Sequence, residues 1–115
     1  MSVGADGLFA VVNLTNQTNF AVTFAFMWDS PGNVWRDWAL QPGEARTFWW
    51  PYAFPNQNQS PNPRVRYAAD MTPAGRFETK TLEAHTSPDS GPSYAKCYDF
   101  RLTTNGREVE LTGAN

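Results

Sequence analysis

The sequence predicts an all-β fold, an antiparallel β-sandwich of about eight short strands that forms a single domain over residues 1–115. Apolar side chains alternate with small or polar ones from Phe20 to Trp28, which is the two-residue repeat of a strand with one buried face. Pro-Gly turn signals recur at short, even intervals, and no segment keeps apolar residues at helical spacing for two turns. A chain of 115 residues is long enough to form one buried core without disulfide bonds or bound metal ions.

Two strands are expected in the first quarter of the chain. The β-branched run Leu8–Leu14 ends at the polar cluster Thr15–Asn19, which is typical of a turn, and the alternating segment Phe20–Trp28 follows it. Consecutive strands joined by a short polar turn usually pair. We therefore expect these two strands to form a hairpin.

Two Pro-Gly turns delimit the next two strands. The turn Asp29–Asn33 precedes a strand over Val34–Leu40, and the turn Gln41–Glu44 precedes a strand over Ala45–Trp50. Proline has no amide hydrogen for a ladder, so Pro51 is expected to end the fourth strand.

The second half alternates loops and strands. Four prolines between residues 51 and 63 predict a long loop or crossover, and a strand with one wet face is expected over Arg64–Ala69. The strand Arg76–Ala84 carries alternating charged side chains and is therefore expected near a sheet edge. A second loop is predicted over Thr86–Ser93.

The C-terminal segment carries a strong hairpin signal. Tyr98, Phe100 and Leu102 alternate on one face, and Val109 and Leu111 alternate on the returning strand. An Asn-Gly pair at 105–106 supplies the residues that a type I′ turn requires.

The charge pattern argues against several partners. Nine basic and 11 acidic residues give a net charge of −2, without a basic run, so nucleic acid is not an expected partner. The chain holds no apolar segment of 18 residues, and its first residues do not have the pattern of a signal peptide. We expect a soluble domain, and a membrane surface is an unlikely partner.

Catalytic and metal-binding patterns are weak. His85 and Cys97 are the only His and Cys, and a thiol in a strand usually behaves as a small apolar side chain. Asp29, Asn33 and Asp37 surround a turn and could supply oxygen ligands to calcium, but their spacing matches no calcium loop, and Asp29 more readily caps the turn. We expect no catalytic residue, no metal and no cofactor.

The aromatic residues are concentrated in one part of the chain. All five Trp lie between residues 28 and 50, and eleven of the 17 aromatic residues lie between residues 20 and 54. Most are expected in the core, foremost Phe20, Phe24, Phe26, Phe48 and Phe100. Trp49 and Trp50 are consecutive, so one of them must face outward if both lie in a strand.

The same parity argument separates Trp35 from Trp38 and leaves an aromatic patch as the candidate binding site. Its predicted members are Trp35, Trp38, Trp49, Trp50, Tyr52, Phe54 and Asn56. Trp, Tyr and Arg are favoured anchors in protein interfaces, so the first hypothesis is a non-catalytic interaction module that contacts a protein partner or another copy of itself. The alternative is a carbohydrate-binding, lectin-like domain, since aromatic rings and amides suit sugars, and a small hydrolase or metal-dependent enzyme comes third.

Five short stretches carry a family resemblance, namely Asn13–Asn16, Val22–Phe24, Trp28–Trp38, Leu40–Glu44 and Gly106–Leu111. Together they resemble a small β-rich module of unassigned function that recurs in bacterial multidomain proteins, some of which carry caspase-like peptidase domains. The resemblance implies an accessory domain within a larger protein, with catalysis elsewhere. It supplies no functional residues to carry over.

Overall fold

The computed structural model describes residues 7–29, 33–53, 62–68, 77–87, 91, 95–103 and 108–113, with the backbone alone at 7, 8, 51–53, 86 and 87. These residues form nine strands. Their bounds are β1 Gly7–Asn16, β2 Val22–Trp28, β3 Arg36–Leu40, β4 Ala45–Ala53, β5 Pro63–Ala68, β6 Phe77–Thr81, β7 His85–Ser87, β8 Lys96–Leu102 and β9 Val109–Gly113.

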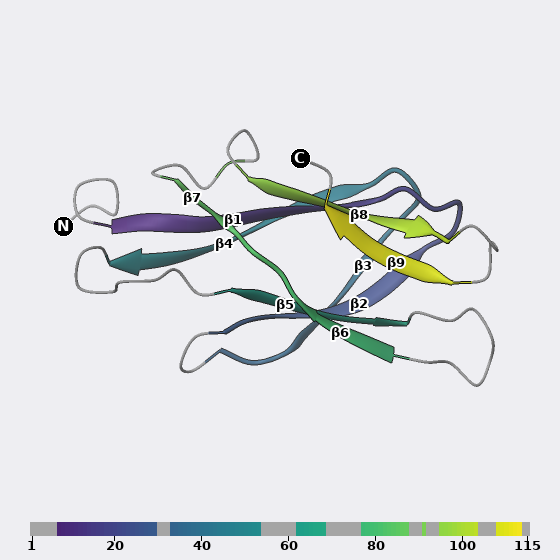
Figure 1. Ribbon diagram of the computed structural model, residues 1–115, viewed down its shortest axis with the longest axis horizontal. Coiled ribbons are helices and arrows are strands. Elements are labelled where there is room, and N and C mark those ends of the chain that lie inside the picture. The colour runs from purple at the N-terminus through teal and green to yellow at the C-terminus, as the bar shows by residue number, and fades with distance from the viewer. Residues whose placement is uncertain are drawn as a thin grey trace.

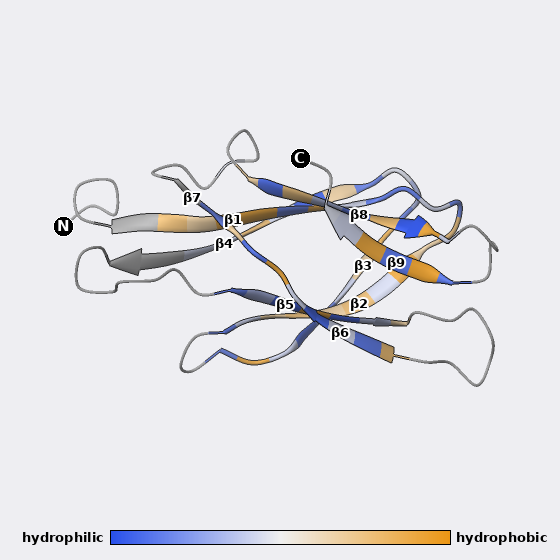
Figure 2. Ribbon diagram, viewed as in Figure 1, coloured by the Kyte–Doolittle hydropathy of each residue, from blue (hydrophilic) through white to orange (hydrophobic). Residues whose placement is uncertain are grey.

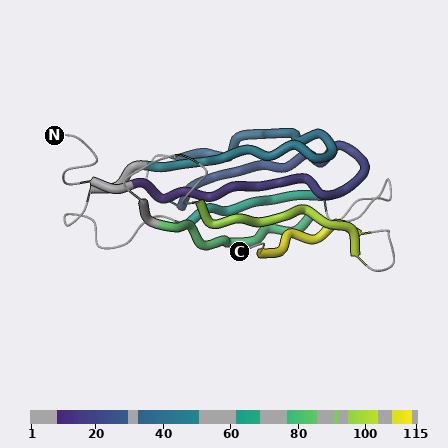
Figure 3. Tube along the Cα trace, turned by 90° about the horizontal axis from the view of Figure 1, so that it is seen from above, coloured from purple at the N-terminus to yellow at the C-terminus, as the bar shows by residue number. Residues whose placement is uncertain are grey.

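The strands lie in two packed layers, which confirms the predicted β-sandwich (Figure 1). The first sheet has the order β4-β1-β8-β9, and the short β7 pairs with β1 on the same side as β8; the second has the order β3-β2-β5-β6. Every pairing is antiparallel except that of β1 with β8. Seen from above, β3 and β4 lie along one side of the molecule and β9 lies along the other (Figure 3).

The core between the sheets is built on stacked aromatic rings. Phe26 of the second sheet stacks on Phe48 of the first at 4.1 Å between centroids, and Phe24 contacts Phe100 at 5.3 Å. Tyr67 continues the series at 5.6 Å from Phe100. Burying each ring removes a large apolar area from water and contributes about 2 kcal/mol.

Four of the five predicted core phenylalanines are buried, and Phe20 packs against them half-buried. Figure 2 shows apolar residues interleaved with hydrophilic ones along the strands of both layers. This alternation is what a two-layer sandwich requires, because only one face of each sheet is dry.

The predicted hairpin between the first two strands is wrong. β1 and β2 belong to different sheets, and β1 pairs instead with β4, β7 and β8. The reason is the side chain of Asn16, the last residue of β1, which is fully buried rather than part of a wet turn.

The Asn16 side chain satisfies all of its hydrogen-bonding capacity inside the protein. Its Nδ2 donates to the carbonyl oxygens of Phe20 at 2.8 Å and Leu40 at 2.9 Å. Its Oδ1 accepts the backbone N–H of Thr18 at 2.8 Å and lies 2.6 Å from the Thr18 hydroxyl. One residue thus joins the end of β1, the start of β2 and the end of β3, so the chain changes sheet at this point.

The backbone of Asn16 also holds the turn between β3 and β4. Its N–H donates to the Glu44 carbonyl at 2.9 Å, and its own carbonyl accepts from Gly43 N–H at 2.8 Å. Gly43 has φ of 80°, and Glu44 N–H donates to Gln41 O, as in a type II turn with Pro42 at its second position. The predicted turn is confirmed.

The predicted end of the fourth strand is wrong. β4 continues to Ala53, with Pro51 opposite Phe9. Among the described strands β4 lies at the edge of its sheet, so one side of it has no described ladder and the missing amide hydrogen of proline is tolerated there.

The predicted loop Thr86–Ser93 is wrong in its first two residues, which belong to β7. The edge position of Phe77–Thr81 in β6 is confirmed, as is the antiparallel pairing of β8 with β9. The Asn-Gly turn at 105–106 lies outside the described residues.

Polar contacts join the two sheets on the side opposite β3 and β4. Lys80 Nζ of β6 donates to the carbonyl oxygen of Leu111 in β9 at 3.1 Å. Within the second sheet, the buried Tyr67 hydroxyl of β5 donates to Glu78 Oε2 of the neighbouring β6 at 3.2 Å. Burial and the Glu78 carboxylate raise the pKa of Tyr67 to about 12, although a backbone hydrogen bond from Leu111 acts in the other direction.

Replacing Asn16 tests the connection between the sheets. We expect Asn16→Ala to lower the free energy of unfolding by about 3 kcal/mol, because it leaves buried carbonyl and N–H groups without partners. Asn13→Ala is the matched control on the same strand, since Asn13 is half-buried and its side chain bonds the Thr15 and Thr47 hydroxyls alone among the described residues. Its expected cost in urea denaturation is about 1 kcal/mol. Equal losses for both variants would contradict the role of Asn16.

The Tyr67 hydroxyl predicts a loss of stability in alkali. Its pKa is higher in the folded state, about 12 against 10.0, so folding retains a proton that the unfolded chain releases. Stability is therefore unaffected by this group below pH 10 and falls by about 2 kcal/mol as the pH rises to 12. Tyr67→Phe should remove this part of the pH dependence in denaturation measured between pH 9 and pH 12. A wild-type curve parallel to that of the variant would refute the assignment.

Candidate functional site: a groove on the outer face of the second sheet

The outer face of the second sheet brings together residues from four strands. Ala25 of β2 lies opposite Asp37 of β3 on one side and opposite Arg66 of β5 on the other. These three residues form one row across the sheet, and their side chains point to the same face because directly paired residues do so. The inward positions are taken by the core rings on either side of Ala25, Phe24 and Phe26.

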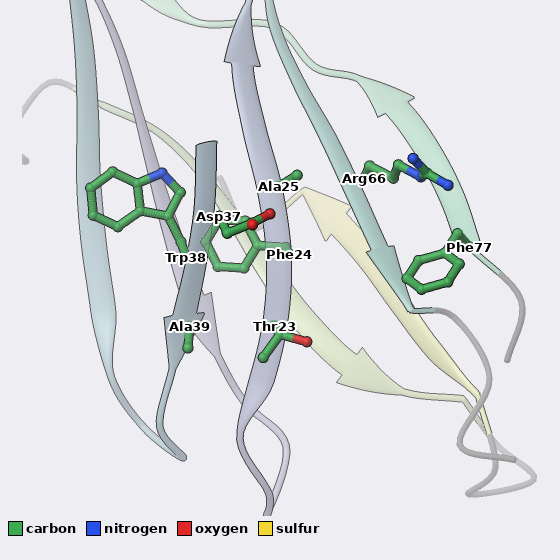
Figure 4. A pocket seen from close by; sticks show the side chains of 8 residues that line it. All are labelled: Thr23, Phe24, Ala25, Asp37, Trp38, Ala39, Arg66 and Phe77. Carbon is green, nitrogen blue, oxygen red and sulfur yellow. The ribbon is translucent and has the colours of Figure 1, made fainter. Parts of the chain in front are cut away.

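This row lies in a groove with a volume of about 770 Å³. Figure 4 shows the residues that line it, which are Thr23, Phe24, Ala25, Asp37, Trp38, Ala39, Arg66 and Phe77. The small side chains at 23, 25 and 39 leave the centre of the face low. Asp37 rises on the β3 side, and Arg66 and Phe77 rise on the β5 and β6 side.

The polar groups of the groove are not used by the fold. Within the part of the chain that the structure describes, Thr23 and Asp37 make no hydrogen bond or ion pair through their side chains, and the Arg66 guanidinium contacts only an aromatic ring. A hydroxyl, a carboxylate and a guanidinium therefore remain available to a ligand. Together they offer both hydrogen-bond donors and acceptors.

Two arginine–aromatic pairs shape the face. The guanidinium carbon of Arg66 lies 5.1 Å from the centroid of the Phe77 ring, which is 61% exposed. Arg64, two residues before Arg66 on the same face, lies 5.6 Å from the Trp35 ring across β2. Such contacts hold the long arginine side chains in place.

The structure separates the predicted aromatic patch. Trp35 is 39% exposed beside the groove, whereas Trp49 is 50% exposed on the other sheet, where its ring contacts Phe9 edge-on at 5.4 Å. One of the two consecutive tryptophans thus faces outward, as parity required. Trp50 is half-buried and packs against the core.

Trp38 closes the side of the sandwich formed by β3 and β4. Its ring lies 5.3 Å from Phe48, and Arg46 of β4 covers it at 4.3 Å. Its half-buried ring belongs mainly to the core, and only part of it reaches the groove. The side chain of Tyr52, and Phe54 and Asn56 entirely, lie outside the described residues.

The weaker candidates for chemistry are placed as follows. His85 lies opposite Val11 and Cys97 opposite Asn13, so both flank the same side of β1, and the Cys97 thiol donates to Ala95 O at 3.6 Å. Among the proposed calcium ligands, Asn33 Oδ1 accepts Trp28 N–H at 2.9 Å, and residues 30–32 of the turn that Asp29 was expected to cap lie outside the described residues. The described residues contain no cluster of three His, Cys, Asp or Glu side chains placed to hold a metal ion.

Comparison of the chain with family models, curated proteins and solved structures finds no match. The resemblance to a bacterial accessory module therefore stays a prediction. Across the described elements there is no helix with the length and apolar character needed to span a membrane. Fold and groove define the chain as a β-sandwich with an open polar and aromatic groove on one sheet.

The two consecutive tryptophans make a matched pair for mutation. We expect Trp50→Ala to cost about 2 kcal/mol of unfolding free energy, because it removes a ring from the core, and Trp49→Ala to cost about 1 kcal/mol or less. In acrylamide quenching of Trp fluorescence, loss of the exposed Trp49 should reduce quenching more than loss of Trp50. The opposite order in either measurement would show that the strand faces are assigned the wrong way round.

Proposed function

We propose that this chain is a non-catalytic accessory binding module whose ligand occupies the groove on the outer face of β3-β2-β5-β6. The observation that carries the proposal is a set of polar side chains at 23, 37 and 66 around a floor of small residues, none of which makes a side-chain hydrogen bond or ion pair to another described residue. Concave sites with a few converging polar groups and aromatic walls are the usual form of a ligand site, and 770 Å³ lies within their usual volume.

The chemistry of the groove favours binding over catalysis. Among the described residues that line it, Asp37 is the one carboxylate, and there is neither His nor Cys. Hydrolysis of a glycosidic bond needs a second carboxylate at a fixed distance, and acyl transfer needs a nucleophile beside a base. Asp37 and Arg66 suit recognition, because a carboxylate accepts hydrogen bonds and a guanidinium donates them.

Two classes of ligand fit such a face. The first is a protein partner or a second copy of the chain, which the exposed Phe77 and the arginine–aromatic pairs support because such residues anchor protein interfaces. The second is a carbohydrate, which the facing hydrogen-bonding groups support. Both place the ligand over Ala25.

Filling the groove tests the proposal. Ala25→Phe puts a ring on the floor between Asp37 and Arg66, and Thr112→Phe puts the same ring on the outer face of the other sheet as a control. The isotope-labelled chain is titrated by NMR with neutral hexasaccharides, acidic and basic decapeptides, and the unlabelled chain. We expect amide shifts on β2, β3, β5 and β6 for at least one probe, abolished by Ala25→Phe and retained in Thr112→Phe.

Other results of the same experiment would contradict the proposed site. Shifts that centre on Phe9 and Trp49, or that survive Ala25→Phe unchanged, would place the binding surface on the first sheet. A panel that leaves every groove amide unperturbed would also overturn the proposal.

A further inference from the structure

We infer that the ligand of the groove is a neutral saccharide, with a sugar ring lying over Ala25 and its hydroxyls bonded to Asp37 on one side and Arg66 on the other. This inference rests on the proposed function and names its ligand class. It rests on three observations, which are the spacing of Asp37 and Arg66, the opposite signs of their charges and the exposed ring of Phe77.

The row Asp37–Ala25–Arg66 sets the width of the site. Neighbouring strands lie about 4.8 Å apart, so the backbones of β3 and β5 lie about 10 Å apart across β2. The structure records no ion pair between Asp37 and Arg66, and the methyl group of Ala25 fills little of the space between them. A ring over Ala25 would therefore meet the Asp37 side chain on the β3 side and, on the β6 side, the guanidinium of Arg66 that lies against Phe77 (Figure 4).

The charges select a neutral ligand with donors and acceptors on one molecule. A carboxylate accepts hydrogen bonds only and a guanidinium donates only, whereas a hydroxyl group does both. An anion that meets Arg66 is repelled by Asp37, and a cation is repelled by Arg66. Vicinal hydroxyls of a sugar satisfy both groups, and the Thr23 hydroxyl beside them has no partner among the described residues.

The Phe77 ring adds an apolar wall. More than half of it is exposed, and Arg66 beside it is already held 5.1 Å from its centroid. The C–H face of a sugar ring removes such a surface from water while its hydroxyls remain on the rim. A polar, hydroxyl-bearing edge combined with an apolar face is characteristic of sugar rings.

A peptide fits the groove less well. Extended peptides commonly bind β domains by adding a strand to an open sheet edge, where backbone groups are free. The floor of the groove is instead the middle of a sheet, since β2 is paired with β3 on one side and β5 on the other. The backbone of a peptide lying there would find only a few side chains as partners.

Calorimetric titration of the full chain tests the inference. The probes are neutral hexasaccharides of glucose, mannose and N-acetylglucosamine. We expect at least one to bind, with affinity lowered about tenfold by Asp37→Asn and by Arg66→Gln, and about fivefold by Phe77→Ala. Trp49→Ala, an exposed aromatic residue on the other sheet, is the matched control and should change affinity less than twofold.

Salt gives an independent readout. Binding of a neutral sugar should change little between about 50 mM and about 500 mM NaCl, because no net charge is brought into the site. The groove variants replace exposed side chains, so their melting temperatures should match that of the wild type within a few degrees.

The outcomes separate the inference from the function on which it rests. If no hexasaccharide binds but a decapeptide or the unlabelled chain shifts groove amides, the saccharide is wrong and the binding groove stands. If a hexasaccharide binds and only Trp49→Ala weakens it, both are wrong. If no probe binds in the groove, both the saccharide inference and the proposed function are wrong.

Discussion

The buried side chain of Asn16 is the constraint on which the arrangement of the two sheets depends. Its amide bonds the carbonyls of Phe20 and Leu40, and its backbone bonds Gly43 and Glu44. Leaving a buried amide group unpaired is costly, so these bonds favour one arrangement of the three strand ends. They fix where the chain leaves the first sheet, where β3 ends and where β4 begins. The register of β3 against β2, and so the place of the groove, follows from the same contact.

Much of the fold follows from short residue patterns that can be recognised directly in the sequence. The alternation from Val22 to Trp28 gives a strand with one dry face, and the pair Pro42-Gly43 gives a turn, because each depends only on neighbouring residues. The partner of a strand is not local. Residues 15–19 have the composition of a hairpin turn, yet the burial of Asn16 and Thr18 turns them into a crossover between sheets. Nothing in their composition distinguishes the two outcomes.

The site shows the same division between local and distant information. Parity correctly required that Trp49 or Trp50 face outward, since adjacent strand residues point to opposite sides. Aromatic density along the chain did not predict one surface, because Trp35 and Trp49 lie on different sheets. The groove joins Ala25 and Asp37 with Arg66 and the later Phe77, and only the order β3-β2-β5-β6 makes them neighbours. The local sign of the groove in the sequence was weak: β6 is a polar strand that carries the exposed Phe77.

Two arginines outside the groove have partners that the fold supplies. Arg101 lies 2.9 Å from Asp99, its neighbour on one face of β8, and Arg46 covers Trp38, so each has a partner that its own fold supplies. In the groove, Arg66 likewise lies against a ring, that of Phe77, whereas the Asp37 side chain has no partner among the described residues, and the two stand on either side of β2. Ala25 lies between them, and its methyl group neither links the two charged groups nor fills the space between them. Two opposite charges left apart over a low floor contribute little to stability at an exposed face. Under the proposed function, they act instead on a ligand that lies between them.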